Sequence, residues 1–190
     1  MRDIDIEKVE TLSSGWISLK KYTIGYASRT GERKRIVREV HDHGDGAAVL
    51  PYDPARGTVL LVRQFRLPAF LRGNREPLIE AAAGLLDGDD PETCARREAE
   101  EELGFRLKKL DRVTQTYLSP GSNTERLTLF LAEYTEADRV SAGGGKESEN
   151  EEIEVLEMPF TKVWSLMASR AISDAKTIIL LLHLRLKLGP

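Results

Sequence analysis

The sequence has little of what marks a secreted or membrane-spanning protein. It has one cysteine, Cys94, so no disulfide can form within the chain, as is usual in a reducing compartment. The most apolar run, residues 178–182, is far shorter than the roughly 20 residues of a membrane-spanning helix. Charged residues in the first eight positions exclude the apolar core of a signal peptide. We therefore expect a cytoplasmic protein without a membrane partner.

An excess of charge of one sign is also absent. The 190 residues include 28 Lys and Arg against 31 Asp and Glu, a formal net charge of -3. Nothing in this balance draws the whole chain to nucleic acid, so we expect no nucleic-acid partner. Aromatic residues are few, at 6%, but 41% hydrophobic residues suffice for the core of a domain of this length.

Apolar periodicity and turn residues predict strands and helices that do not alternate regularly, which favours an α+β fold over a parallel α/β fold. Three short N-terminal strands bury little by themselves, so they must pack on the main domain or on another copy of the chain. We place an N-terminal antiparallel β subdomain at residues 1–42 and the main domain at 43–190. Strands are expected at 16–19, 22–26, 34–41, 47–50, 59–62, 113–118, 127–134 and 155–158, with a shorter apolar stretch at 78–82, and helices at 91–103, 160–170 and 174–188.

The expected helix at 91–103 is unusually acidic. Asp90 is its predicted N-cap, Pro91 its first residue and Gly104 its C-terminal stop. At about 100° per residue, Glu98, Glu101 and Glu102 fall within an arc of roughly 100° that borders the apolar stripe. These carboxylates should therefore be only partly solvated.

The pairing of charges on this helix favours a metal site over a salt-bridged surface. Arg96 can reach Glu100, and Arg97 can reach Glu101, four residues on. Glu98 and Glu102 have no basic residue at helical spacing and should repel each other by about 0.2–0.5 kcal/mol or more. A divalent cation would relieve this repulsion, and hard oxygen ligands suit Mg²⁺ or Mn²⁺.

The segment from Gly84 to Phe105 resembles the Nudix box. Residues 97–105, Arg-Glu-Ala-Glu-Glu-Glu-Leu-Gly-Phe, match every fixed position of its second half. The first half departs from the family pattern, because Asp89 stands where the family has glutamate and Gly84 lies one residue too close. The resemblance implies a Nudix fold, a mixed sheet sandwiched between helices. It also implies metal-assisted attack of water on a diphosphate linked to another group.

The resemblance further implies the roles of individual residues. Magnesium ions, with manganese as a substitute, would be held by the backbone carbonyl of Ala83 and by Glu98, Glu102 and Glu151. Glu101, Glu102 and Glu151 are the candidate catalytic residues; Glu101 could instead simply pair with Arg97. The glycine-rich loop that carries Glu151 is two residues longer than expected, so Glu149 or Glu152 could replace it as a mobile carboxylate.

Candidate substrate-binding residues follow from the same resemblance. Trp16 would stack on a guanine base, or else belong to the core of the N-terminal sheet. Arginine suits phosphate because its donors are forked, although any one arginine could form a surface salt bridge. The full candidate set is Trp16, Arg38, Glu39, Arg66, Gly84, Leu85, Glu125 and Lys176.

One element narrows the expected substrate. Tyr117-Leu118-Ser119-Pro120-Gly121, followed by Glu125, resembles an element of the nucleoside-diphosphate-sugar hydrolases of this family. Stretches at 62–66, 83–87, 142–145 and 174–177 are most similar to the bacterial branch that cleaves GDP-mannose. The expected activity is hydrolysis of GDP-mannose to GMP and mannose 1-phosphate by a homodimer that exchanges its N-terminal strands. The alternatives are an ADP-ribose pyrophosphatase and a non-catalytic Nudix module that only binds a nucleotide.

Overall fold

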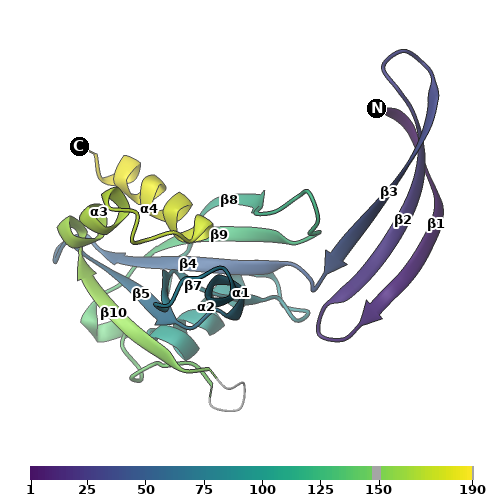
Figure 1. Cartoon of the computed structure of the whole chain (residues 1–190). Coiled ribbons are helices and arrows are strands. Elements are labelled where there is room, and N and C mark those ends of the chain that lie inside the picture. Colours follow the sequence, from purple (N-terminus) through teal and green to yellow (C-terminus); the bar gives the residue numbers. More distant parts are fainter. Residues whose placement is uncertain (147–150, 190) are drawn as a thin grey trace. The chain divides into compact units, whose positions relative to one another are not determined.

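The computed structural model describes residues 1–146 and 151–189 in two compact units (Figure 1). The first unit is Met1–Asp45 with Tyr117–Arg126, and the second is Gly46–Thr116 with Leu127–Pro190. The domain boundary that we predict between residues 42 and 43 stays a prediction.

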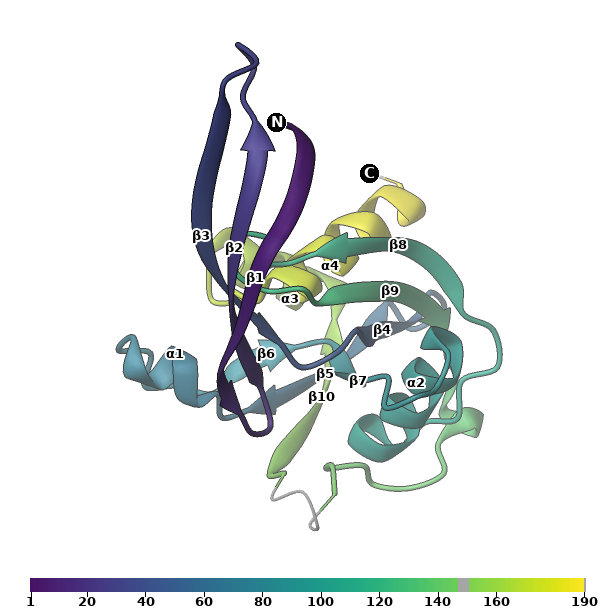
Figure 2. The same ribbon diagram turned by 90° about the vertical axis from the view of Figure 1, so that its right-hand side faces the viewer.

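The first unit contains the expected N-terminal antiparallel sheet. It consists of β1 (Arg2–Ser14), β2 (Ser18–Ala27) and β3 (Arg33–Asp42), which lie side by side in that order (Figure 2). β1 was not predicted: apolar and charged residues alternate only from Asp3 to Glu7, and beyond that the register shifts and nearly all residues are exposed. The prediction that a strand begins at Trp16 is wrong, because this residue lies in the turn before β2.

The second unit is built on a seven-stranded mixed sheet, in which five strands follow the order β10-β5-β4-β9-β8 and two short strands pair beside β5 and β4. β4 (Gly46–Asp53) and β9 (Arg126–Glu133) are parallel, whereas β5 (Thr58–Gln64) pairs antiparallel with β4 and with β10 (Ile153–Pro159). β8 (Asp111–Tyr117) lies at the edge. Every residue of β4 is buried, which explains its continuous apolar run. The mixed sheet confirms the expected α+β class.

The central strands β4 and β5 separate soon after their turn. They pair only through Tyr52–Val59 and Asp53–Thr58. Beyond this point β5 pairs with β6 (Leu78–Glu80) and β4 with β7 (Ala82–Leu85). The apolar stretch at 78–82 therefore belongs to two strands, because the chain crosses from β6 to β7 at Ala81.

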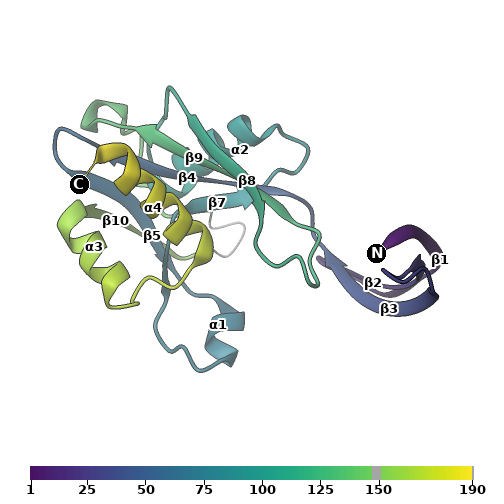
Figure 3. The same ribbon diagram turned by 90° about the horizontal axis from the view of Figure 1, so that it is seen from above.

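Helices cover both faces of this sheet, as the resemblance to the Nudix box predicts. α2 (Pro91–Glu98) lies on one face, and α3 (Phe160–Ala168) and α4 (Ala175–Leu188) lie on the other (Figures 1 and 3). The short α1 (Leu67–Leu71), which has no buried residue, and a 3₁₀ turn at Glu136–Asp138 were not predicted. Among the described residues, no helix is long and apolar enough to cross a membrane.

The acidic helix is not α-helical throughout. Asp90 caps it as expected and accepts hydrogen bonds from the backbone N–H groups of Glu92 and Thr93. The last turn, Ala99–Leu103, is a π-helix, so a continuous α-helix over 91–103 is wrong. Gly104 ends the turn with φ +80°, and the N–H of Phe105 reaches back to the carbonyl of Ala99. π-turns of this kind are frequent at functional sites.

Candidate active site

The π-turn and the end of α2 bury two glutamates beside β7. Glu98 is 7% exposed and Glu102 only 1%. Glu102 Oε2 accepts a hydrogen bond from the Ala83 N–H at 3.2 Å and forms no ion pair with any residue that the structure describes. Glu98 does have a partner, because the Arg97 guanidinium turns back to its neighbour and donates to Oε1 at 2.6 Å. Helical spacing did not predict this pair, because Arg97 is adjacent to Glu98 and not three or four residues away.

Gly84 allows β7 to approach these carboxylates closely. A Cβ atom at this position would lie 2.1 Å from Glu98 Oε1, a distance that no real Cβ contact shows. Any other residue would displace the Glu98 side chain. The close approach of β7 to Glu98 thus explains why the sequence motif begins with glycine, Gly84.

Burial makes both carboxylates weak acids. Desolvation, reinforced by the charges of Glu101 and Glu151, raises the pKa of Glu98 to about 7 against the opposing charge of Arg97. Desolvation and the charge of Glu98 raise the pKa of Glu102 to about 8. Two carboxylates in one low-dielectric site cannot both ionise cheaply without added positive charge. The pair therefore fits a hard divalent cation, whose charge would keep both ionised.

Arg97 connects the parts of this site. Its guanidinium donates to the Leu85 carbonyl at 2.9 Å, and it lies 3.4 Å from Asp89 and 3.5 Å from Glu101. Asp89 therefore orients Arg97, although it stands where the family has glutamate. Cys94 Sγ donates to the carbonyls of Gly84 and Leu85, and burial raises its pKa to about 11, so the thiol is a packing group.

The base of the glycine-rich loop is fixed to the π-turn. The N–H groups of Gly144 and Gly145 donate to the carbonyls of Glu102 and Glu101 at 2.9 and 3.1 Å. Gly143 has φ +68°, and a Cβ atom there would lie 2.5 Å from the Glu102 carbonyl oxygen. Only glycine permits this contact between two backbones.

This loop brings a third carboxylate toward the pair. The Glu151 side chain accepts a hydrogen bond from the Lys146 N–H at 3.0 Å, and its charge acts on both buried glutamates. The Lys146 ammonium pairs with Glu101 at 2.8 Å, so Glu101 lies between two cations. Glu152 is exposed, and Glu149 lies outside the described residues. Within the described chain, no three His, Cys, Asp or Glu side chains form a ready metal cluster.

A second charged group surrounds Glu80 on β6. Its carboxylate accepts hydrogen bonds from Arg66 Nε at 2.8 Å and Nη2 at 3.0 Å, and from the Lys176 ammonium. Lys176 also pairs with Asp174 at 3.1 Å and is buried. Sequence reasoning missed Glu80, and its signal was a single charge inside the apolar run 78–83.

The remaining candidates belong to the first unit. Trp16 is 77% exposed and contacts the His43 ring at a centroid distance of 5.4 Å, so it is no core residue. Arg38 and Glu39 are exposed on β3, and Arg38 donates to the neighbouring Val37 carbonyl. Glu125 is held by Asn123 within the loop after β8. Their contribution to the site stays a prediction.

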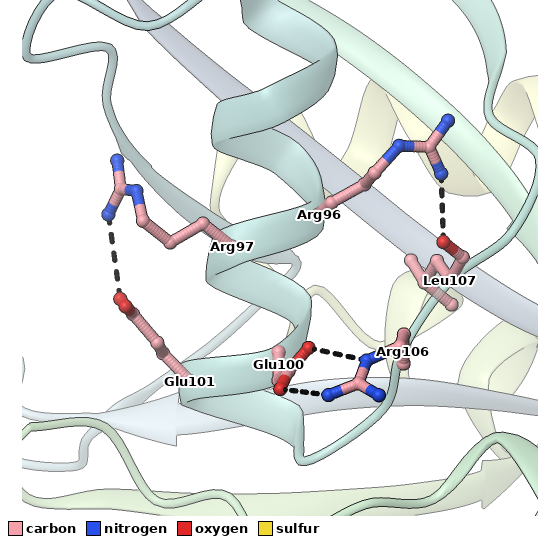
Figure 4. Close-up of a pocket in the computed structure, with 6 residues that line it drawn as sticks. All are labelled: Arg96, Arg97, Glu100, Glu101, Arg106 and Leu107. Atoms are coloured by element: carbon pink, nitrogen blue, oxygen red, sulfur yellow. Dashed lines mark hydrogen bonds and ion pairs between the residues drawn. The ribbon is translucent and has the colours of Figure 1, made fainter.

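A surface depression of about 420 Å³ lies along another side of the acidic helix (Figure 4). All its arginines are engaged: Arg106 binds Glu100, and Arg96 donates to the Leu107 carbonyl at 2.8 Å. The expected pair of Arg96 with Glu100 is therefore wrong. The depression lacks both buried glutamates and has no unsatisfied charge that would place the reaction there. Its lining is Arg96, Arg97, Glu100, Glu101, Arg106 and Leu107.

Known proteins resemble this chain along almost its whole length. A model of the N-terminal domain of the GDP-mannose pyrophosphatase NudK matches residues 3–41, and the NUDIX domain model matches 42–181. A GDP-mannose pyrophosphatase of Pectobacterium atrosepticum is 47% identical over 95% of this chain and 93% of its own. One of Cronobacter sakazakii is 46% identical over 97% and 96%.

A solved structure shares the fold. The crystal structure of an ADP compounds hydrolase covers 99% of this chain and 95% of its own, with a TM-score of 0.75 and 17% identity. That identity supports the fold alone. The domain match and the nearly full-length relatives agree with the box at 97–105, and the chain therefore belongs to the Nudix hydrolase family.

Proposed function

We propose that this enzyme hydrolyses GDP-mannose to GMP and mannose 1-phosphate with Mg²⁺ as cofactor. The observation that carries the proposal is the buried pair Glu98–Glu102: Glu102 has no ion-pair partner among the described residues, so both carboxylates can ionise together only with added positive charge. Relatives 46–47% identical over nearly the full chain are named GDP-mannose pyrophosphatases, which supports the choice of substrate.

The residues around the pair suit magnesium. Glu98, Glu102, Glu151 and the backbone carbonyl of Ala83 would hold it, and all of these ligands are oxygens. Mn²⁺ accepts the same ligand types. When bound, the metal would offset the charge of the diphosphate and lower the pKa of a water molecule. Glu151 would take the proton of the attacking water, because it comes from the loop beside the pair.

The diphosphate would be bound by cations of the same unit. Arg66 offers forked donors and Lys176 a single ammonium, and both lie around Glu80. Gly84 and Leu85 would meet the substrate through their backbones. Trp16, Arg38, Glu39 and Glu125 would bind the nucleoside and sugar, and the 77% exposure of Trp16 suits stacking on guanine. Glu101 would support the site through Arg97 and Lys146.

The N-terminal sheet indicates how the chain assembles. No buried apolar residue of the described chain precedes Ala47, so the N-terminal sheet has no core of its own. Ile4, Ile6 and Leu12 of β1 are each about half exposed or more. We infer a homodimer in which these strands pack on a second copy, acting in the cytoplasm.

Steady-state hydrolysis of a panel of nucleotide sugars tests the function. With Mg²⁺, kcat/KM should be clearly higher for GDP-mannose than for ADP-ribose, and chromatography should identify GMP and mannose 1-phosphate. Excess EDTA should abolish turnover. Equal or better cleavage of ADP-ribose would contradict the choice of substrate, and nucleotide binding without any turnover would favour a non-catalytic module.

A further inference from the structure

Glu80 is a deeply buried carboxylate that binds two cations at once. It is 2% exposed, and its oxygens accept from both Nε and Nη2 of Arg66 and from the Lys176 ammonium. Burial alone would raise the pKa of Glu80, but the hydrogen bonds from Arg66 and the charge of Lys176 outweigh it and lower the pKa. The carboxylate is therefore ionised at neutral pH and fixes both cations.

This arrangement orients Arg66 for a ligand. Glu80 occupies one edge of the guanidinium, and no described residue accepts a hydrogen bond from Nη1. The Arg66 side chain remains 41% exposed. Burial lowers the pKa of Arg66, whereas Glu80 and the charge of Glu102 raise it, so the guanidinium also lies within the field of the metal-binding pair. A donor edge fixed in this way suits an oxyanion beside Glu102.

We propose that Glu80 is a positioning residue. It holds the cationic groups of Arg66 and Lys176 in the places where they bind the diphosphate of the substrate. The inference rests on the proposed function, since it assumes that these cations meet a nucleoside diphosphate. The benefit is pre-organisation: both long side chains lose their rotamer freedom before the ligand arrives.

A second set of bonds holds the same elements together without Glu80. The Ala81 N–H donates to Thr177 Oγ1 at 2.7 Å, and Asp174 accepts from both the N–H and the hydroxyl of Thr177. These bonds join the start of α4 to the segment between β6 and β7. Loss of the Glu80 charge should therefore disturb the two cations more than the docking of α4.

The variant Glu80→Gln tests the proposal, because it keeps the size of the side chain and removes its charge. We expect KM for GDP-mannose, and the Kd of GDP measured by calorimetry in EDTA, to rise roughly 10- to 100-fold, as for one lost charged hydrogen bond. The melting temperature should change by only a few degrees. The matched control is Glu157→Gln on β10, which removes the charge of a carboxylate bound to Arg56 at 2.7 Å. It should leave KM and Kd unchanged.

A double-mutant cycle separates positioning from general structure. If Glu80 acts through Arg66, Glu80→Gln should weaken GDP binding much less in an Arg66→Ala background. Should Glu80→Gln fail to fold, Glu80→Asp keeps the charge, withdraws the carboxylate by one methylene and should still raise KM.

Two results would overturn the role of Glu80: wild-type KM and Kd in the folded variant, or an undiminished effect in the Arg66→Ala background. A wild-type enzyme that cleaves a different nucleotide sugar would instead contradict the proposed substrate. KM of the wild-type enzyme and of Glu80→Gln would then be compared with that compound, and Kd again with GDP.

Discussion

Glu80 and Glu102 are the most deeply buried carboxylates of the described chain, and their surroundings shift their pKa values in opposite directions. Glu80 accepts hydrogen bonds from two cationic side chains, and its pKa is lowered. Glu102 receives one backbone N–H and no ion pair, and its pKa is raised to about 8. A buried charge left unpaired is costly unless something outside the chain compensates it. This contrast at the residue scale supports metal binding at Glu102 more directly than the sequence spacing did.

Replacing Glu102 by glutamine should separate stability from activity. The neutral amide removes the repulsion with Glu98, so the melting temperature in EDTA should be unchanged or higher. Hydrolysis should fall roughly 100-fold or more, because a metal ligand is lost. Glu100→Gln, which loses only its exposed pair with Arg106, is the control and should stay active. Near wild-type turnover of Glu102→Gln would exclude Glu102 as a ligand.

Stability without metal should fall as pH rises. The folded pKa values of about 7 for Glu98 and about 8 for Glu102 lie above the ordinary value of 4.5, so the folded state binds more protons than the unfolded state between these limits. Stability contributed by the protonated pair is complete below about pH 4.5 and is lost as pH rises through about 7 to 8.

Thermal unfolding in EDTA from pH 5 to 8.5 measures this loss. The double variant Glu98→Gln/Glu102→Gln should show a flatter profile than the wild-type chain, and Mg²⁺ should raise the wild-type melting temperature most at high pH. Parallel profiles for the two proteins in EDTA would contradict the raised pKa values.

At the scale of elements, the sequence predicted the acidic helix with its cap and its stop, because Asp90, Pro91 and Gly104 are local signals. It did not predict the π-turn, because that turn depends on hydrogen bonds from a loop distant in the sequence. The N–H groups of Gly144 and Gly145 donate to the carbonyls of Glu102 and Glu101. The strand break at Ala81 was missed for a similar reason, since only partner strands define where β6 ends and β7 begins.

The contact between Gly143 and the π-turn can be tested with alanine. Gly143→Ala combines a φ of +68° with a collision 2.5 Å from the Glu102 carbonyl oxygen. Gly88→Ala is the matched control, since φ is +97° but nothing lies within 4 Å. Strain alone should cost Gly88→Ala about 1 kcal/mol, or roughly 2–4 °C in melting temperature. Gly143→Ala should lose at least twice as much, together with activity; equal losses would contradict a steric role for Gly143.

For the whole molecule, sequence patterns and family resemblance predicted the mixed sheet, its two covered faces and an N-terminal antiparallel sheet. The long β1 was missed because its hydrophobic alternation ends at Glu7, and the rest of the strand is exposed and shifted in register. Glu80 and Lys146 were missed because their roles come from partners far away in the sequence, Lys176 and Glu101. The candidates in the first unit rest on resemblance alone.

The exposed apolar residues of β1 predict a dimer. Light scattering of the full chain should give twice the chain mass of 21.3 kDa. A chain that lacks residues 1–40 should lose both the dimer and most activity, because in the proposed assembly this sheet would supply the contact and several substrate-binding side chains. A folded, fully active monomer after this deletion would rule out the exchanged strands.

The bonds between the π-turn and Gly143–Gly145 also bear on how this family of sequences can vary. They anchor the loop at its first residues, so the number of residues inserted after Gly145 does not alter the backbone around Glu102. Length and chemistry of the following segment can then change while the π-turn keeps its shape. The loop is thereby an exchangeable module: a shorter or longer loop that keeps a carboxylate at the position of Glu151 should alter substrate preference and leave the backbone around Glu102 unchanged.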